Sequence, residues 1–265
     1  VLADVQVDAL ERALDEMHTL GAQSLPYRLD VSKAVEVEAL AKATVDRFGA
    51  PHVVFNNAGV GFGGLIWEHS AQDWEWVMGV NLMGVAHGVR VFTPLMLEAA
   101  AHDGAYEGHI VNTASMAGLL NPPNMGVYNV SKHAVVSLTE TLYQDLSLVT
   151  DRISASVLCP YFVPTGINQS HRNRPGALSA DGAAPTKSQR IAQAMTAKAV
   201  ESGKVSAAQV AGLVFDAMRK KRFYIYSHPK ALASVQTRLE DVAQMRNPSD
   251  PFAHKPEIGA GLRAA

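Results

Sequence analysis

The chain is poor in cysteine, and this limits its possible cross-links. Cys159 is the only cysteine among 265 residues, so no intrachain disulfide can form. A chain without disulfides is typical of a reducing compartment, and the sequence therefore predicts a cytoplasmic protein. Cys159 ends an apolar run, which favours a buried core thiol over a reactive one.

Three further absences exclude classes of function. Basic residues form a run only at 219–222, at the end of a helical pattern, and the net charge is −2, so we expect no nucleic-acid partner. No apolar run is long enough to span a bilayer and the N-terminus lacks a secretion signal, so we expect no membrane. The ten histidines form no HxxxH or HExxH pair, so we expect no metal.

What the chain does contain is an alternation of short β-branched runs and longer segments of helical period. This alternation predicts an α/β fold, a doubly wound parallel sheet with helices on both faces, as a single domain over 1–265. Strands are expected at 1–5, 23–31, 52–59, 108–115, 153–160 and 222–229. Helices are expected at about 10–20, 33–48, 71–99, 126–149, 189–202 and 206–221. Ser70 and Asp73 have the form of a capping box before the third helix.

Composition changes in two later segments. Residues 166–188 are rich in Asn, Arg, Pro, Gly, Ser and Ala, which predicts a mobile surface segment. Residues 246–265 contain Pro and Gly and are expected to form a surface tail.

Unusual polar residues stand just after the predicted strands. Ligands of parallel sheets bind beyond the carboxyl ends of the strands, so this clustering predicts a ligand site along one edge. Local interpretations remain open, because Asp4 and Asp30 fit helix N-caps and Asn-Asn-Ala-Gly fits a simple turn. The residues concerned are Asp4, Asp30, 56–59, Ser115 and 160–165.

Tyr128 lies four residues before Lys132 in a predicted helix, so both side chains are on one helix face. A lysine ammonium favours the phenolate of a nearby tyrosine, which would make the phenol a usable acid or base near neutral pH. The spacing alone also fits an aromatic stem beside a solvated lysine.

Five patterns occur in one order along the chain. They are Asn-Asn-Ala-Gly at 56–59, Asn81 with Gly84, Ser115, Tyr128 with Lys132, and Pro160 to Thr165. In this combination the chain resembles the short-chain dehydrogenase/reductase family, the single-domain Rossmann oxidoreductases, from residue 1 to about 226. The resemblance implies the Rossmann form of the fold and a nicotinamide cofactor.

The resemblance implies roles for four catalytic residues. Tyr128 would be the general acid/base, and Lys132 would lower the pKa of that tyrosine and hold the nicotinamide ribose. Ser115 would orient the substrate oxygen. Asn81, within the long helix, would hold a water that links Lys132 to solvent.

The resemblance also implies cofactor-binding residues. Asp4 would accept hydrogen bonds from the ribose diol and repel the extra phosphate of NADP, which favours NAD. Asp30 and Val31 would meet the adenine, and Asn57, Ala58 and Gly59 would line the adenosine ribose side. Val163 and Thr165 would contact the nicotinamide half, beside Tyr128 and Lys132.

The chain departs from the family pattern in two places. The glycine-rich phosphate loop and the strand before it do not occur in the chain, so we expect this N-terminal segment to be missing from the sequence and the sheet to lack a central strand without it. Tyr161 stands where the family usually has glycine and would narrow the substrate pocket, and Met116, Leu120 and Phe162 are further candidates for its wall.

The expected function is NAD-dependent interconversion of a secondary alcohol and a ketone, with 166–205 as a lid over the substrate. A non-catalytic cofactor-binding or scaffold protein on the same fold, and an epimerase or dehydratase, remain alternatives. Family members usually pair the helices at 71–99 and 126–149 with their copies, so we expect a homodimer or homotetramer.

Overall fold

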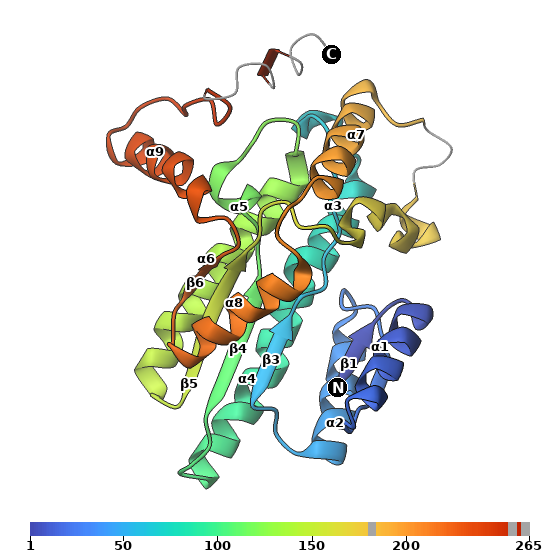
Figure 1. Cartoon of the computed structure of the whole chain (residues 1–265), viewed down its shortest axis with the longest axis vertical. Coiled ribbons are helices and arrows are strands. Elements are labelled where there is room, and N and C mark those ends of the chain that lie inside the picture. Colours follow the sequence, from blue (N-terminus) through green and yellow to red (C-terminus); the bar gives the residue numbers. More distant parts are fainter. Residues whose placement is uncertain (180–183, 254–258, 261–265) are drawn as a thin grey trace.

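The structure is a computed structural model that describes residues 1–179, 184–253 and 259–260. Its main sheet has four parallel strands in the order β3-β4-β5-β6 (Figure 1). The strand bounds are β3 Val53–Asn56, β4 Gly108–Thr113, β5 Ile153–Cys159 and β6 Tyr224–Tyr226. Since the strands are parallel, all their carboxyl ends lie at one edge.

A second pair of parallel strands, β1 (Leu2–Asp4) and β2 (Pro26–Arg28), lies beside β3 with helices α1 (Val7–Thr19) and α2 (Ala34–Phe48) (Figure 1). In the described chain β1 and β3 are not joined by a ladder, so the sheet is interrupted between them. The outer residues Val53 and Phe55 of β3 are 47% and 44% exposed in consequence.

Helices cover both faces of the main sheet, because alternate residues of each strand point to opposite sides. Ile110 of β4 packs in a core with α2, α4 and α6, whereas its neighbour Val111 packs against Val210 and Val214 of α8. This arrangement confirms the predicted doubly wound α/β fold. The helix bounds are α3 Ala71–Met78, α4 Gly84–His102, α5 Ala117–Leu120, α6 Gly126–Val149, α7 Lys187–Glu201, α8 Ala207–Arg219 and α9 Leu232–Ala243.

The predicted helix at 71–99 is one continuous stretch of three parts. The Ser70–Asp73 capping box is confirmed at the start of α3, and a π-helical segment, Gly79–Met83, joins α3 to α4. By length and mean hydropathy (1.2), Ala71–His102 could cross a membrane, so the statement from sequence that no apolar run is long enough is wrong, whereas the absence of a membrane partner stays a prediction. In this fold the stretch packs on α2, α6 and strands β3 and β4.

Two helices and one loop differ from the sequence prediction. The short helix α5 and the helix α9 were not predicted, although Val235 of α9 packs in the core. The segment predicted as irregular forms short 3₁₀ helices at Gly166–Asn173 and Gly176–Leu178. Residues 180–183, and residues 254–258 and 261–265 of the predicted tail, lie outside the described residues.

Candidate active site

Lys132 is the centre of the candidate site, although its charged group would ordinarily lie in water. It is on α6, is only 3% exposed, and donates a hydrogen bond of 2.9 Å to the backbone carbonyl of Thr113 at the end of β4. Its Nζ lies 5.9 Å from the ring centroid of Tyr128, one helical turn before it. Burial lowers the pKa of Lys132 to about 8, because a buried ammonium loses its hydration.

Tyr128 and Ser115 are brought together from α6 and from the loop after β4. Burial raises the pKa of the Tyr128 phenol, and the hydrogen bond with Ser115 opposes that rise. The sequence expectation was a pKa lowered by Lys132, and the direction here is the reverse. The reason is that burial disfavours the phenolate.

Asn81 lies in the π-helical segment and is completely buried. Its Oδ1 accepts from the backbone N–H of Val60 at 2.7 Å, and its Nδ2 donates to the Val60 carbonyl and to Ser131 Oγ, both at 3.0 Å. Both amide hydrogens therefore bind protein groups. The side chain thereby positions the loop after β3 against α6, and the water link from Lys132 to solvent stays a prediction.

Gly59 in that loop shows that the backbone must pass close to the catalytic groups. A Cβ at this position would lie 3.3 Å from Lys132 Nζ and 3.4 Å from Asn81 Oδ1. A methyl group here would be in tight contact with the ammonium, so glycine permits the close passage of the loop. Asn57 and Ala58 just before it are exposed, and Asn57 Oδ1 accepts from Thr113 Oγ1 at 3.0 Å.

Asp4 and Asp30 stand at the far end of the same edge. Asp4 is exposed, and its Oδ1 accepts from the Gln6 backbone N–H at 2.8 Å. The N-cap of α1 is Gln6, so Asp4 is not the helix N-cap that the sequence also allowed. Asp30 Oδ1 accepts from both the N–H (2.9 Å) and the hydroxyl (2.7 Å) of Ser32, so it shapes the turn before α2.

The other predicted cofactor-binding residues differ in how far their side chains are exposed. Thr165 is exposed, and its hydroxyl accepts from the Ile167 N–H at 3.5 Å. Val163 is 9% exposed with its side chain in the core beside α8, so only its backbone is available to a ligand. Val31 is half-buried and packs against Gly84 of α4.

Together these residues fit a dinucleotide. A carboxylate at the end of β1, a close backbone passage at Gly59 and a buried ammonium at Lys132 lie along one edge of the strands, which is where parallel sheets bind such ligands.

Sequence reasoning missed two contributors to the site and one ion pair outside it. Ser131 binds Asn81, and its place directly before Lys132 was the available signal. The Thr113 carbonyl that holds the ammonium is a backbone group with no sequence signal. The buried ion pair of Asp73 and Arg174 joins residues that are distant in the chain, so no local pattern predicts it.

Comparison with known proteins gives the same result as the geometry. The family model described as short chain dehydrogenase matches residues 1–176. A solved short chain dehydrogenase/reductase from Burkholderia phymatum, in complex with NAD, is 54% identical with a TM-score of 0.90, over 95% of this chain and 88% of that one.

Two curated relatives extend over most of the chain. The "CLA biosynthesis dehydrogenase/reductase" of Lactiplantibacillus plantarum is 30% identical over 91% of this chain and 83% of its own. The "1-deoxy-11-beta-hydroxypentalenate dehydrogenase" of Streptomyces exfoliatus is 32% identical over 91% and 78%. The chain therefore belongs to the short chain dehydrogenase family of Rossmann-fold oxidoreductases.

Proposed function

We propose that this protein is an NAD-dependent oxidoreductase that interconverts a secondary alcohol and a ketone. The observation that carries the proposal is the meeting of Ser115, Tyr128 and Lys132 in one partly enclosed site at the carboxyl ends of the strands. A hydroxyl, a phenol and an ammonium in such a site are suited to proton transfer at a substrate oxygen.

Each residue has a defined task in this proposal. Ser115 hydrogen-bonds the substrate oxygen and orients it toward the phenol. In oxidation the Tyr128 phenolate removes the proton of the alcohol, and in reduction the phenol returns it. The nicotinamide cofactor, when bound, accepts the hydride from the substrate carbon or supplies it. Lys132 stabilises the phenolate electrostatically from one helical turn away.

Asp4 supports NAD over NADP as the cofactor. Its carboxylate is exposed at the end of β1, where it can accept hydrogen bonds from ribose hydroxyls and would repel a ribose phosphate. The similar protein from Burkholderia phymatum was solved with NAD, which supports the same choice.

The substrate side is apolar. Tyr161 is 40% exposed, and its ring contacts Phe162, with centroids 4.6 Å apart. Met116 is completely buried in the core and so does not line the pocket, contrary to the sequence expectation. These walls favour an alcohol or ketone with an apolar body.

The test is a spectrophotometric screen of secondary alcohols with NAD and with NADP, using the wild type and Tyr128→Phe. We expect NADH formation by the wild type and a loss of about 100-fold or more in turnover for the variant, because the proton acceptor is removed. Tyr143→Phe is the matched control, since Tyr143 is on the same helix and is 41% exposed. Turnover by Tyr128→Phe at the level of the control would contradict the role of Tyr128.

The same screen separates the alternatives. A scaffold protein would bind NAD but form no NADH with any alcohol, and an epimerase or dehydratase would give a product without net redox change. The lid at 166–205, the homodimer or homotetramer and the cytoplasmic location remain predictions.

A further inference from the structure

We infer that Arg174 and Asp73 form a positioning pair that holds residues 166–178 across the cofactor edge and so controls retention of NAD. We call residues 166–178 the strap. The inference rests on the proposed cofactor, but it concerns residues that take no part in the proposed chemistry.

The strap touches the chain at two points along the edge that bears the candidate site. It begins at Gly166, after the loop that follows β5, and the buried Ser170 Oγ accepts from the backbone N–H of Gly61 at 2.8 Å. Further on, the side-chain amides of Asn173 and Gln6 are 2.7 Å apart. Gly61 follows β3 and Gln6 follows β1, so the strap crosses from β5 past β3 to β1, over the strand ends where the dinucleotide is proposed to lie.

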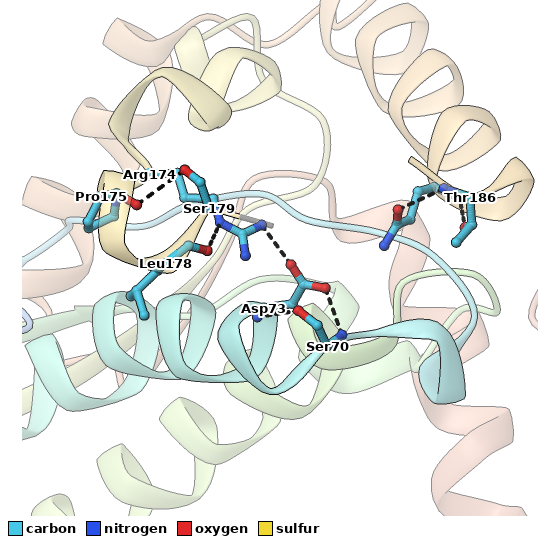
Figure 2. Close-up of polar contacts among 8 residues, drawn as sticks. Ser70, Asp73, Arg174, Pro175, Leu178, Ser179 and Thr186 are labelled. Carbon is cyan, nitrogen blue, oxygen red and sulfur yellow. Dashed lines mark hydrogen bonds and ion pairs between the residues drawn. The ribbon is translucent and has the colours of Figure 1, made fainter. Parts of the chain in front are cut away.

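Arg174 fixes the far end of the strap through two hydrogen bonds. Its Nη1 donates to Asp73 Oδ1 at 2.6 Å, and its Nε donates to the Leu178 carbonyl at 2.6 Å (Figure 2). The two side chains of the ion pair are only 13% and 7% exposed. Charges are rarely buried without a partner, so this geometry is specific to one position of the strap.

Two aromatic rings complete the surroundings of the guanidinium. Its carbon lies 5.1 Å from the ring centroid of Trp76 and 5.7 Å from that of Phe62. The third nitrogen, Nη2, is buried and has no hydrogen-bond partner among the described residues, so these rings are its available electrostatic partners. Lysine lacks the planar group and the second donor that this arrangement uses.

Asp73 belongs both to the ion pair with Arg174 and to the start of helix α3. Its Oδ2 accepts from the Ser70 N–H at 2.8 Å as part of the capping box of α3 (Figure 2). The continuous helix then leads to Asn81, which holds Val60 next to Gly59. The hydrogen bonds of Asn81 and Lys132 involve neither Asp73 nor Arg174, so we expect loss of the ion pair to release the strap and to leave these two residues in place.

The experiment compares Arg174→Met with wild type and with Arg190→Met. Arg190 is an exposed arginine on α7 that donates to the Pro185 carbonyl, so it matches the substitution without the ion pair. We measure the dissociation constant for NAD by equilibrium dialysis, hydrogen exchange by mass spectrometry, and turnover at saturating NAD.

For Arg174→Met we expect a dissociation constant raised by about tenfold or more, equal to about 1.4 kcal/mol. Exchange should rise in the strap and at Gly61 but not in β4, and turnover at saturating NAD should stay within about twofold of wild type. A merely structural role would instead raise exchange in β4. If Arg174→Met does not fold, Arg174→Lys, which keeps the positive charge, should show the same changes at smaller size.

Exchange of the strap at the wild-type rate in a folded Arg174 variant would overturn the inference. So would a faster exchange with the same NAD dissociation constant as Arg190→Met. Both results leave the proposed function intact. A wild-type protein that binds neither NAD nor NADP would overturn the proposed function and this inference together.

Discussion

At the scale of single residues, Lys132 and Tyr128 show how burial prepares a pair of groups for proton transfer. Burial lowers the pKa of the ammonium to about 8 and raises that of the phenol, because each loses hydration in its charged form. A positive charge placed beside the phenol has the opposite effect on it and favours the phenolate. Lys132 is such a charge, with its Nζ 5.9 Å from the centroid of the Tyr128 ring, so burial and this ammonium act on the phenol in opposite directions.

His109 gives a residue-scale prediction about pH. It is 7% exposed on β4, with Nε2 2.8 Å from Ser156 Oγ, and burial lowers its pKa from 6.5 to about 4. As pH falls from 6.5 to about 4, His109 becomes protonated in the unfolded chain but stays neutral in the folded chain. The free energy of unfolding should therefore decrease between pH 6.5 and 4, by about 3 kcal/mol from this group.

Urea unfolding of wild type and His109→Gln across this range is the measurement. The variant should lose most of this pH dependence, whereas His18→Gln, at an exposed position on α1, should keep it. Equal slopes for wild type and His109→Gln would show that other groups cause the acid sensitivity.

At the scale of elements, the stretch from α3 to α4 combines a capping box, a π-helical segment and close packing on the sheet. The π-helical segment inserts extra backbone into the helix and turns Asn81 toward Val60. Gly88, on α4, lies against Asn56 at the end of β3, which donates to Asn112 Oδ1 at 2.8 Å. The side-chain amides of Asn56 and Asn112 thus join strands β3 and β4 where helix α4 packs on them.

A glycine-to-alanine change at Gly88 tests this contact, and the same change at Gly212, outside it, is the comparison. The two changes should shift the free energy of unfolding in opposite directions. A Cβ at Gly88 would lie within 2.0 Å of Asn56 Oδ1, so Gly88→Ala should lower the free energy of unfolding by roughly 1–3 kcal/mol. At Gly212 of α8 nothing lies within 4 Å, so Gly212→Ala should raise it by up to about 1 kcal/mol. The midpoints of urea unfolding measure both. A neutral Gly88→Ala would mean that Asn56 moves at little cost.

At the scale of the whole molecule, the surface retains large apolar side chains near the end of α6. Tyr143, Leu148 and Val149 are 41%, 82% and 66% exposed. Single exposed apolar residues are ordinary, but three on one helix end favour contact with a second copy of the chain. The pairing of α6 with its copy stays a prediction, and these residues are candidates for the contact.

Light scattering at micromolar concentration should therefore give two or four times the chain mass of 28.4 kDa. Leu148→Glu should shift the protein toward the monomer, because a carboxylate is poorly tolerated in an apolar contact. Leu20→Glu, at a 75% exposed position by the end of α1, is the matched control and should have no effect. A wild-type mass of 28.4 kDa would contradict the assembly.

Much of the fold and part of the site were accessible from sequence, because their signals are local. The alternation of strands and helices, the capping box of α3 and the polar residues after each strand depend on neighbours a few positions apart. The spacing of Tyr128 and Lys132 on one helix face is of the same kind. These features identified the family, which the comparisons confirm, and they led to the prediction of a site at the carboxyl edge of the sheet.

Only the tertiary structure decided how these groups are held and charged. The direction of the Tyr128 pKa depends on burial, and the partners of Asn81 come from other segments, Val60 and Ser131. The pair of Asp73 and Arg174 joins residues 101 positions apart. Burial and contacts of this kind arise when distant segments pack together, and a local pattern of residues carries no record of them.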